Sequence, residues 1–146
     1  MIKLAILISG HGSNMIKLME SITKNNLSVC ISIVISNNAC NGIAHASRMG
    51  VKNQIIEKKE FDNSDAHDNA ILKSIVAVGA DYIFLAGYMA ILGKNFTEHF
   101  AGKIVNIHPS LLPSLKGLNT HQRAIDENAV NHGASVHIVT ADLDDG

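Results

Sequence analysis

The sequence contains only two cysteines, Cys30 and Cys40, which is too few for a disulfide framework. Two free thiols suit a reducing compartment, so we expect a cytoplasmic protein. Apolar residues occur only in short runs, and none reaches the roughly 18 residues needed to cross a bilayer. The net charge is -1, which provides no basic surface for nucleic acid or membrane lipid. These features are compatible with a small-molecule enzyme, but they are also compatible with most globular domains.

The chain has no repeat, low-complexity tract or linker, so we expect one domain over residues 1–146. The apolar run from Ile2 to Ile8 predicts a strand that is buried on both faces. Further strands are expected at 29–35, 54–56, 81–86, 104–107 and 135–140, and helices at 15–22, 43–49, 66–78, 92–100 and 120–128. This alternation predicts an α/β fold with an open, mostly parallel, doubly wound, Rossmann-like sheet and helices on both faces. Such sheets bind ligands at the carboxyl ends of their strands.

The first candidate site follows the first strand, in the segment from Ser9 to Asn14. Its glycines allow a tight turn, and a helix start offers unpaired N–H groups to a phosphate. The segment could therefore bind a phosphate, and Asn14 is also a possible helix cap. A plain capped turn explains the segment equally well. The spacing is not GxGxxG, which disfavours a dinucleotide.

The second candidate site is Asn106-Ile107-His108-Pro109, at the end of the fifth strand. Asn106 and His108 lie two residues apart, so their side chains point to the same side of an extended backbone. An amide that steadies an oxyanion and an imidazole that moves a proton suit addition to a carbonyl. Both prolines of the chain, Pro109 and Pro113, stiffen this segment. A structural loop with a buried histidine is the alternative.

Two weaker patterns follow other strands. The acidic turn Asp142-Leu143-Asp144-Asp145-Gly146 follows the sixth strand, where a carboxylate could orient His108 and favour the protonated imidazole. The spacing does not show that the two side chains meet, and an acidic turn alone explains the pattern. The apolar loop from Ala86 to Leu92 could line the pocket of a flat aromatic ligand, although a simple core contact explains it too.

The remaining histidines show no pattern typical of a metal site. His45, His67 and His99 fall on predicted helices and are expected at the surface. The other three lack ligand spacing to a cysteine or carboxylate: His121, His132 and His137. We therefore expect no bound metal.

Several segments taken together resemble the folate-dependent formyltransferase family, and within it the enzymes that formylate the amine of glycinamide ribonucleotide. The resemblance runs from Leu4 to Gly146 and is carried by ISGHGSN, VISNNACNGIAHA, LAGYMAIL, IVNIHPSLLPSLKGLNTHQRAI and HGASVHIVTADLDDG. It implies formyl transfer from the cosubstrate 10-formyltetrahydrofolate in de novo purine biosynthesis, by a monomer or homodimer without metal, nucleic acid or membrane. It implies catalysis by Asn106, His108 and Asp144, phosphate binding by Gly12, Ser13 and Asn14, and folate binding by Ser64, Met89, Ala90, Ile91, Leu92 and Asn106.

Other users of 10-formyltetrahydrofolate fit the sequence less well. Methionyl-tRNA formyltransferase shares the Asn-x-His-Pro segment but has arginine, glycine and two alanines where this chain has residues 116–120. It also carries a tRNA-binding domain, and formyltetrahydrofolate hydrolase carries an N-terminal regulatory domain. A further alternative is a truncated or diverged domain that binds phosphate or folate without catalysis.

The chain departs from the family pattern in four ways. The missing arginines and the early stop favour that last alternative, whereas the retained Asn106, His108 and Asp144 disfavour it. Family members commonly have arginine at the positions of Ser64 and Ala90, and histidine at the position of Asn119. Their chains also continue past Gly146 into another strand and helices, so we expect a catalytic domain without that stretch.

Overall fold

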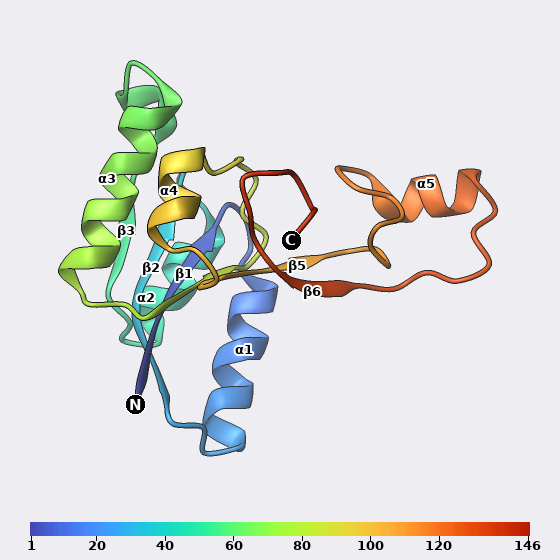
Figure 1. Ribbon diagram of the computed structural model, residues 1–146. Coiled ribbons are helices and arrows are strands. Elements are labelled where there is room, and N and C mark those ends of the chain that lie inside the picture. Colours follow the sequence, from blue (N-terminus) through green and yellow to red (C-terminus); the bar gives the residue numbers. More distant parts are fainter.

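A six-stranded sheet forms the centre of the computed structural model, which describes residues 1–146 (Figure 1). The strands are β1 (Ile2–Ile8), β2 (Val29–Ser36), β3 (Asn53–Ile55), β4 (Tyr82–Leu85), β5 (Ile104–His108) and β6 (Ser135–Ile138). The helices are α1 (Ser13–Lys24), α2 (Asn41–Arg48), α3 (Ser64–Ala77), α4 (Lys94–His99) and α5 (Thr120–Asp126), and Lys58–Glu60 form a 3-10 turn, η1. Strands and helices alternate in the order that the sequence predicts.

The strand order is β3-β2-β1-β4-β5-β6. All neighbouring strands are parallel except β5 and β6, which are antiparallel. The chain builds outward from β1 in one direction through β2 and β3, and in the other through β4 and β5. The order therefore reverses between β1 and β4, which is the topological switch point of an open α/β sheet.

Alternate residues of β1 enter two separate cores. Ala5 and Leu7 pack in a cluster with residues of α3 and α4, whereas Ile6 and Ile8 pack with residues of α1 and α2. All four side chains are fully buried. Burial of each of the three large ones stabilises the fold by about 1.5–3 kcal/mol. The two helix pairs thus cover opposite faces of the sheet (Figure 1), which confirms the predicted doubly wound α/β fold.

One histidine expected at the surface is buried. His67 is only 1% exposed, and its Nε2 lies 2.7 Å from the carbonyl oxygen of Ile56. The expectation was wrong because the apolar stripe of α3, which includes Ile71 and Ile75, continues one turn back to His67 at the same i, i+4, i+8 spacing. His45 is half-buried and His99 is exposed.

Several predicted boundaries also shift. The helix expected from residue 92 begins at Lys94, because residues 90–93 belong to the loop after β4. The last strand ends at Ile138. None of the helices is both long and apolar enough to span a membrane.

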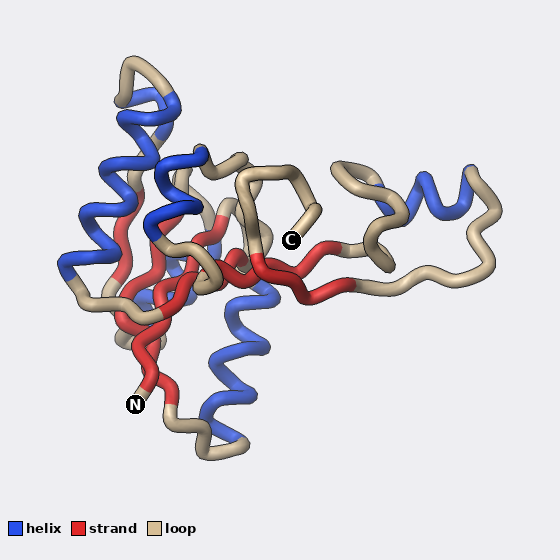
Figure 2. The backbone as a smooth tube through the Cα atoms, in the orientation of Figure 1, coloured by secondary structure: helices blue, strands red, loops and turns tan.

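Residues 109–134, which connect β5 to β6, project away from the rest of the molecule and carry α5 (Figures 1 and 2). Large apolar side chains are exposed along this projection: Leu118, Ile125 and Val130. Its base is the β5–β6 pair, so it begins directly after His108.

Candidate functional site

The candidate residues follow strands that adjoin the switch point. The segment from Ser9 to Gly12 leaves β1, and residues 86–93 leave β4. β5 pairs with β4 and ends at His108. Because β1, β4 and β5 are parallel, their carboxyl ends lie along one edge of the sheet.

The loop after β1 leaves backbone amides open at the start of α1. Gly12 precedes the helix with a left-handed φ of 77°, and no side chain caps the helix. A Cβ on Gly12 would lie 3.0 Å from the Met15 Cε, so the position has little room for a side chain. Ser13 and Asn14 are exposed and form the first turn. The expectation that Asn14 caps α1 was wrong, since the helix begins before it; the uncapped amides are suited to an anion.

The first turn of α2 packs directly against this loop. The Gly42 amide donates to the Gly10 carbonyl at 3.0 Å. A Cβ on Gly42 would lie 2.4 Å from Ile8 Cδ1 and 2.8 Å from the Gly10 oxygen. The first turn of α2 can therefore lie this close to the loop only because residue 42 is glycine. This contact supports the loop on the β2 side of the sheet.

Asn106 and His108 lie on the same side of β5, as their spacing predicts. Asn106 is half-buried and His108 is buried. The His108 Nε2 lies 2.8 Å from the Leu115 carbonyl oxygen. A carbonyl only accepts, so Nε2 carries a hydrogen and donates it.

The other side of the His108 ring faces Asp144. Its Nδ1 lies 3.5 Å from Asp144 Oδ1, and the two side chains are only 6% and 9% exposed. Asp144 Oδ2 accepts from the Gly117 amide at 2.8 Å. Because β6 is antiparallel, the residues after Ile138 must turn back to bring Asp144 to this position. The structure thus brings together two residues whose spacing gave no sign of contact.

Serine hydroxyls fix the loop that follows His108. The Ser110 Oγ donates to the Ser114 carbonyl at 2.6 Å, and Ser135 Oγ donates to the Ser110 carbonyl at 2.7 Å. The Leu112 amide donates to the same Ser135 hydroxyl at 2.9 Å. The Leu112–Pro113 peptide bond is cis. These bonds hold the segment that presents the Leu115 carbonyl to His108.

His137 contacts Asn106, although its position in the sequence gives no sign of this. The two residues are paired across β5 and β6, and Asn106 Nδ2 lies 3.3 Å from His137 Nε2. The His137 Nδ1 lies 3.2 Å from the Ile138 carbonyl oxygen. A neutral imidazole that donates from Nδ1 can accept the amide hydrogen of Asn106 at Nε2. This contact follows from the antiparallel register of β5 and β6, whereas the positions of the two residues in the sequence do not predict it.

The loop after β4 presents two large apolar side chains to solvent. Met89 and Ile91 are each 71% exposed, whereas Leu92 is buried in the core with residues of α3. Ala90 is half-buried. Ser64 is exposed in the first turn of α3. The Met89 and Ile91 side chains thus form an exposed apolar rim, whereas the Leu92 side chain is part of the hydrophobic core.

α3 holds the end of this loop through Asp68. Its Oδ2 accepts from the Gly93 amide at 2.8 Å. Burial raises the pKa of the Asp68 carboxyl. Burial and the nearby Asp68 charge also raise the pKa of the Tyr88 phenol, whose hydroxyl is buried without a hydrogen-bond partner. Two polar groups are thus buried beneath the loop.

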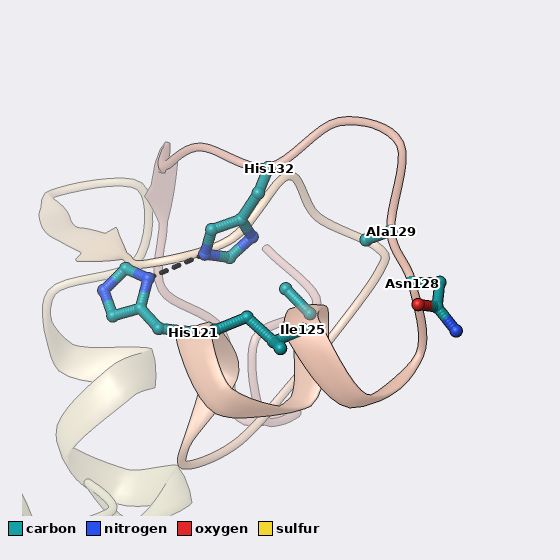
Figure 3. Close-up of a pocket in the computed structure, with 6 residues that line it drawn as sticks. His121, Ile125, Asn128, Ala129 and His132 are labelled. Atoms are coloured by element: carbon teal, nitrogen blue, oxygen red, sulfur yellow. Dashed lines mark hydrogen bonds between the residues drawn. The ribbon is translucent and has the colours of Figure 1, made fainter.

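A separate hollow of about 480 Å³ lies on the projecting segment, beside α5 (Figure 3). His121 and His132 point toward one another there, with Nδ1 and Nε2 2.7 Å apart. The sequence gives no sign of this pair, because His121 lies in the first turn of α5 and His132 lies in the loop that follows the helix. None of Asn106, His108 and Asp144 lines the hollow. No group of three or more histidine, cysteine or acidic side chains suited to a metal ion is present.

Known proteins resemble this chain over almost its whole length. The formyl transferase family matches residues 2–146. The phosphoribosylglycinamide formyltransferase of Haemophilus influenzae is 42% identical over 99% of this chain and 68% of its own, and that of Escherichia coli is 38% identical over 98% and 68%. The solved phosphoribosylglycinamide formyltransferase of Coxiella burnetii is 41% identical, with a TM-score of 0.95 over 99% of this chain and 68% of its own.

The agreement extends beyond local motifs to the whole fold. Glycinamide ribonucleotide transformylase 1 of Symbiobacterium toebii superposes with a TM-score of 0.96 over 100% of this chain and 69% of its own, at 33% identity. This chain spans about two thirds of each of these relatives. Both sequence and fold lead to the same conclusion: the chain belongs to the formyl transferase family.

Proposed function

We propose that this protein transfers the formyl group of 10-formyltetrahydrofolate to the glycinamide amine of glycinamide ribonucleotide, a step of de novo purine biosynthesis. The proposal rests on family membership and on one geometric observation. His108 lies between the Asp144 carboxylate, at 3.5 Å, and the Leu115 carbonyl, at 2.8 Å. A protein that only binds ligand has no need of an imidazole held in this way at the end of a strand.

The reaction begins when the amine attacks the formyl carbon, which gives a tetrahedral centre with an oxyanion. We assign Asn106 to steady the oxyanion through its amide hydrogen. The attacking nitrogen gives up one proton, the oxyanion collapses as the bond to the folate nitrogen breaks, and the folate nitrogen leaves with one proton, so no net proton is gained or lost. His108 acts as the general acid for this transfer or as a cation beside the oxyanion. Asp144 compensates the charge of the protonated imidazole.

The two substrates occupy the loops on either side of the switch point. Uncapped amides of Gly12, Ser13 and Asn14 receive the phosphate of the ribonucleotide. The folate lies against Met89, Ala90 and Ile91 and against the backbone at Leu92, with Ser64 and Asn106 at its margins. Ser64 and Ala90 supply no charge for an acidic folate tail, so folate affinity relies on the apolar rim and the backbone.

We also propose the binding partners, compartment and oligomeric state of the enzyme. The substrates are small molecules, and neither nucleic acid nor membrane takes part. Cys30 and Cys40 are free and half-buried, which suits the cytoplasm. One catalytic domain over residues 1–146 carries all the residues assigned above, as a monomer or homodimer.

The direct test is an assay with both substrates and the purified full-length protein. Tetrahydrofolate should form only when 10-formyltetrahydrofolate and glycinamide ribonucleotide are both present. Omission of the ribonucleotide separates this reaction from simple hydrolysis of the formyl group. Binding of both ligands without tetrahydrofolate formation would refute the transferase and identify a non-catalytic binding domain.

A further inference from the structure

Ser9 lies at the switch point and touches both loops assigned to the substrates. It is the first residue after β1, and it precedes the Gly12–Asn14 segment by only three positions. In the sheet, β1 lies between β2 on one side and β4 on the other. Ser9 is half-buried between the loops that leave these two strands.

The Ser9 hydroxyl makes one hydrogen bond in each direction. It donates to Asn37 Oδ1, in the loop after β2, at 2.8 Å. It accepts from the Met89 amide, in the loop after β4, also at 2.8 Å. The Ser9 carbonyl accepts from Asn38 Nδ2 at 3.1 Å. One residue thus joins three loops that are far apart in the sequence.

The bond to Met89 is the sole hydrogen bond between residues 87–92 and the rest of the protein. The amide of Ala86, before this stretch, donates to Leu7, and the amide of Gly93, after it, donates to Asp68. Between them only the Met89 amide is paired, and its partner is the Ser9 hydroxyl. Apart from the packing of Leu92 and Tyr88 against the core, the stretch from residue 87 to residue 92 is therefore held by one serine, in the segment that leads into Gly12–Asn14.

We propose that Ser9 is a positioning residue that couples the phosphate site to the folate site, an inference that rests on the proposed function. A phosphate at Gly12–Asn14 fixes the backbone that directly follows Ser9, and so fixes the direction of its hydroxyl. The hydroxyl then holds the Met89 amide, and the folate binds a loop whose ordering is already complete. The donor and acceptor bonds of one hydroxyl strengthen each other, which favours this transmission.

The coupling must be equal in both directions, because it is a difference in binding free energy. The dissociation constant of tetrahydrofolate is measured by calorimetry without and with saturating glycinamide ribonucleotide, and the ratio is the coupling factor. We expect a factor of about five or more in the wild type, within the usual range for coupled sites. Ser9→Ala should bring this factor close to one, while each ligand alone still binds.

Two further variants separate coupling from a general loss of structure. Ser9→Thr keeps the hydroxyl and should retain most of the coupling. Ser32→Ala is the matched control, since it removes a half-buried serine hydroxyl that donates to the Leu4 carbonyl within the sheet; it should leave the factor unchanged. If Ser9→Ala fails to fold, Asn37→Ala removes the acceptor of the Ser9 hydroxyl and should lower the factor in the same direction.

Amide hydrogen exchange provides a readout that is independent of turnover. The Met89 amide should exchange slowly in the wild type, more slowly with glycinamide ribonucleotide, and rapidly in Ser9→Ala. An unchanged coupling factor in a folded Ser9→Ala protein, or equal protection of Met89 in both proteins, would overturn the inference. Failure of the wild type to bind either ligand would instead reject the proposed function.

Discussion

Loss of the Asp144 charge is the sharpest test of the proposed catalytic arrangement. Asp144→Asn preserves the shape of the side chain, and the new amide oxygen can still accept from the Gly117 amide. The other arm, 3.5 Å from His108 Nδ1, loses its negative charge. Because both side chains are almost fully buried, solvent cannot replace that charge.

The magnitude follows if the 3.5 Å contact tightens to a hydrogen bond when His108 is protonated, because a hydrogen bond to a charged group is worth about 1.5–3 kcal/mol. At about 1.4 kcal/mol for each factor of ten, turnover should fall by roughly ten- to one-hundred-fold. His108→Ala should cost more, about one-hundred- to ten-thousand-fold, because the proton-transfer group itself is lost. The Michaelis constants should change far less, since both substrate loops remain.

The assay is steady-state turnover of the full-length protein, with both single variants and the double variant measured together. Asp144 is proposed to act through His108, so adding Asp144→Asn to His108→Ala should cost little more. His99→Ala, which removes an exposed histidine of α4, is the control and should turn over normally. Full additivity in the double variant, or near-normal turnover of His108→Ala, would refute the reasoning.

Three further changes test other parts of the structure. His137→Phe removes the 3.3 Å contact with Asn106 and should lower kcat about five-fold, which corresponds to about 1 kcal/mol. His137→Gln should restore part of the lost kcat, and an equal loss of kcat in both variants would contradict an orienting role. Asp68 has a pKa raised by burial above its ordinary 3.8, so the folded protein retains a proton that the unfolded chain has lost, and stability falls as pH rises through that window. Asp68→Asn should remove this fall in urea midpoints, and an unchanged pH dependence would count against it. Gly42→Ala places a Cβ 2.4 Å from Ile8 Cδ1 and should cost about 1–3 kcal/mol of stability and weaken phosphate binding, whereas Gly50→Ala, where nothing lies within 4 Å, tests the separate cost of a left-handed backbone.

The sequence was sufficient for the fold because its strongest patterns are local. The apolar run of β1 indicates burial on both faces, and Gly50 and Gly79, both with positive φ, follow the C-cap residues of α2 and α3. The surface position expected for His67 is wrong because its place in the stripe of Ile71 and Ile75 decides its burial more than its residue type does. Polar character does not keep a side chain at the surface when its ring can donate to a buried carbonyl.

The candidate site was only partly accessible from the sequence. Asn106 and His108 share one strand, so alternation alone places them together. The contacts of Asp144 with His108, and of His137 with Asn106, depend on the direction and register of β6, which no local pattern specifies. The hydrogen bonds of the Ser9 hydroxyl depend on partners from two other loops, which no local pattern specifies either.

The position of β1 in the middle of the sheet also affects the order in which the strands pair during folding. β1 pairs with β2 soon after it in the sequence, as Ile2 with Val29, but with β4 only across a much longer separation, as Leu4 with Tyr82. Early pairing can therefore complete the half made of β1, β2 and β3, while the half that bears His108 must close a long loop and so forms more slowly. Until β4 arrives, one edge of β1 remains unpaired and open to strands of other chains. The same reversal of strand order that creates the ligand site thus makes its assembly the late and aggregation-sensitive stage of folding.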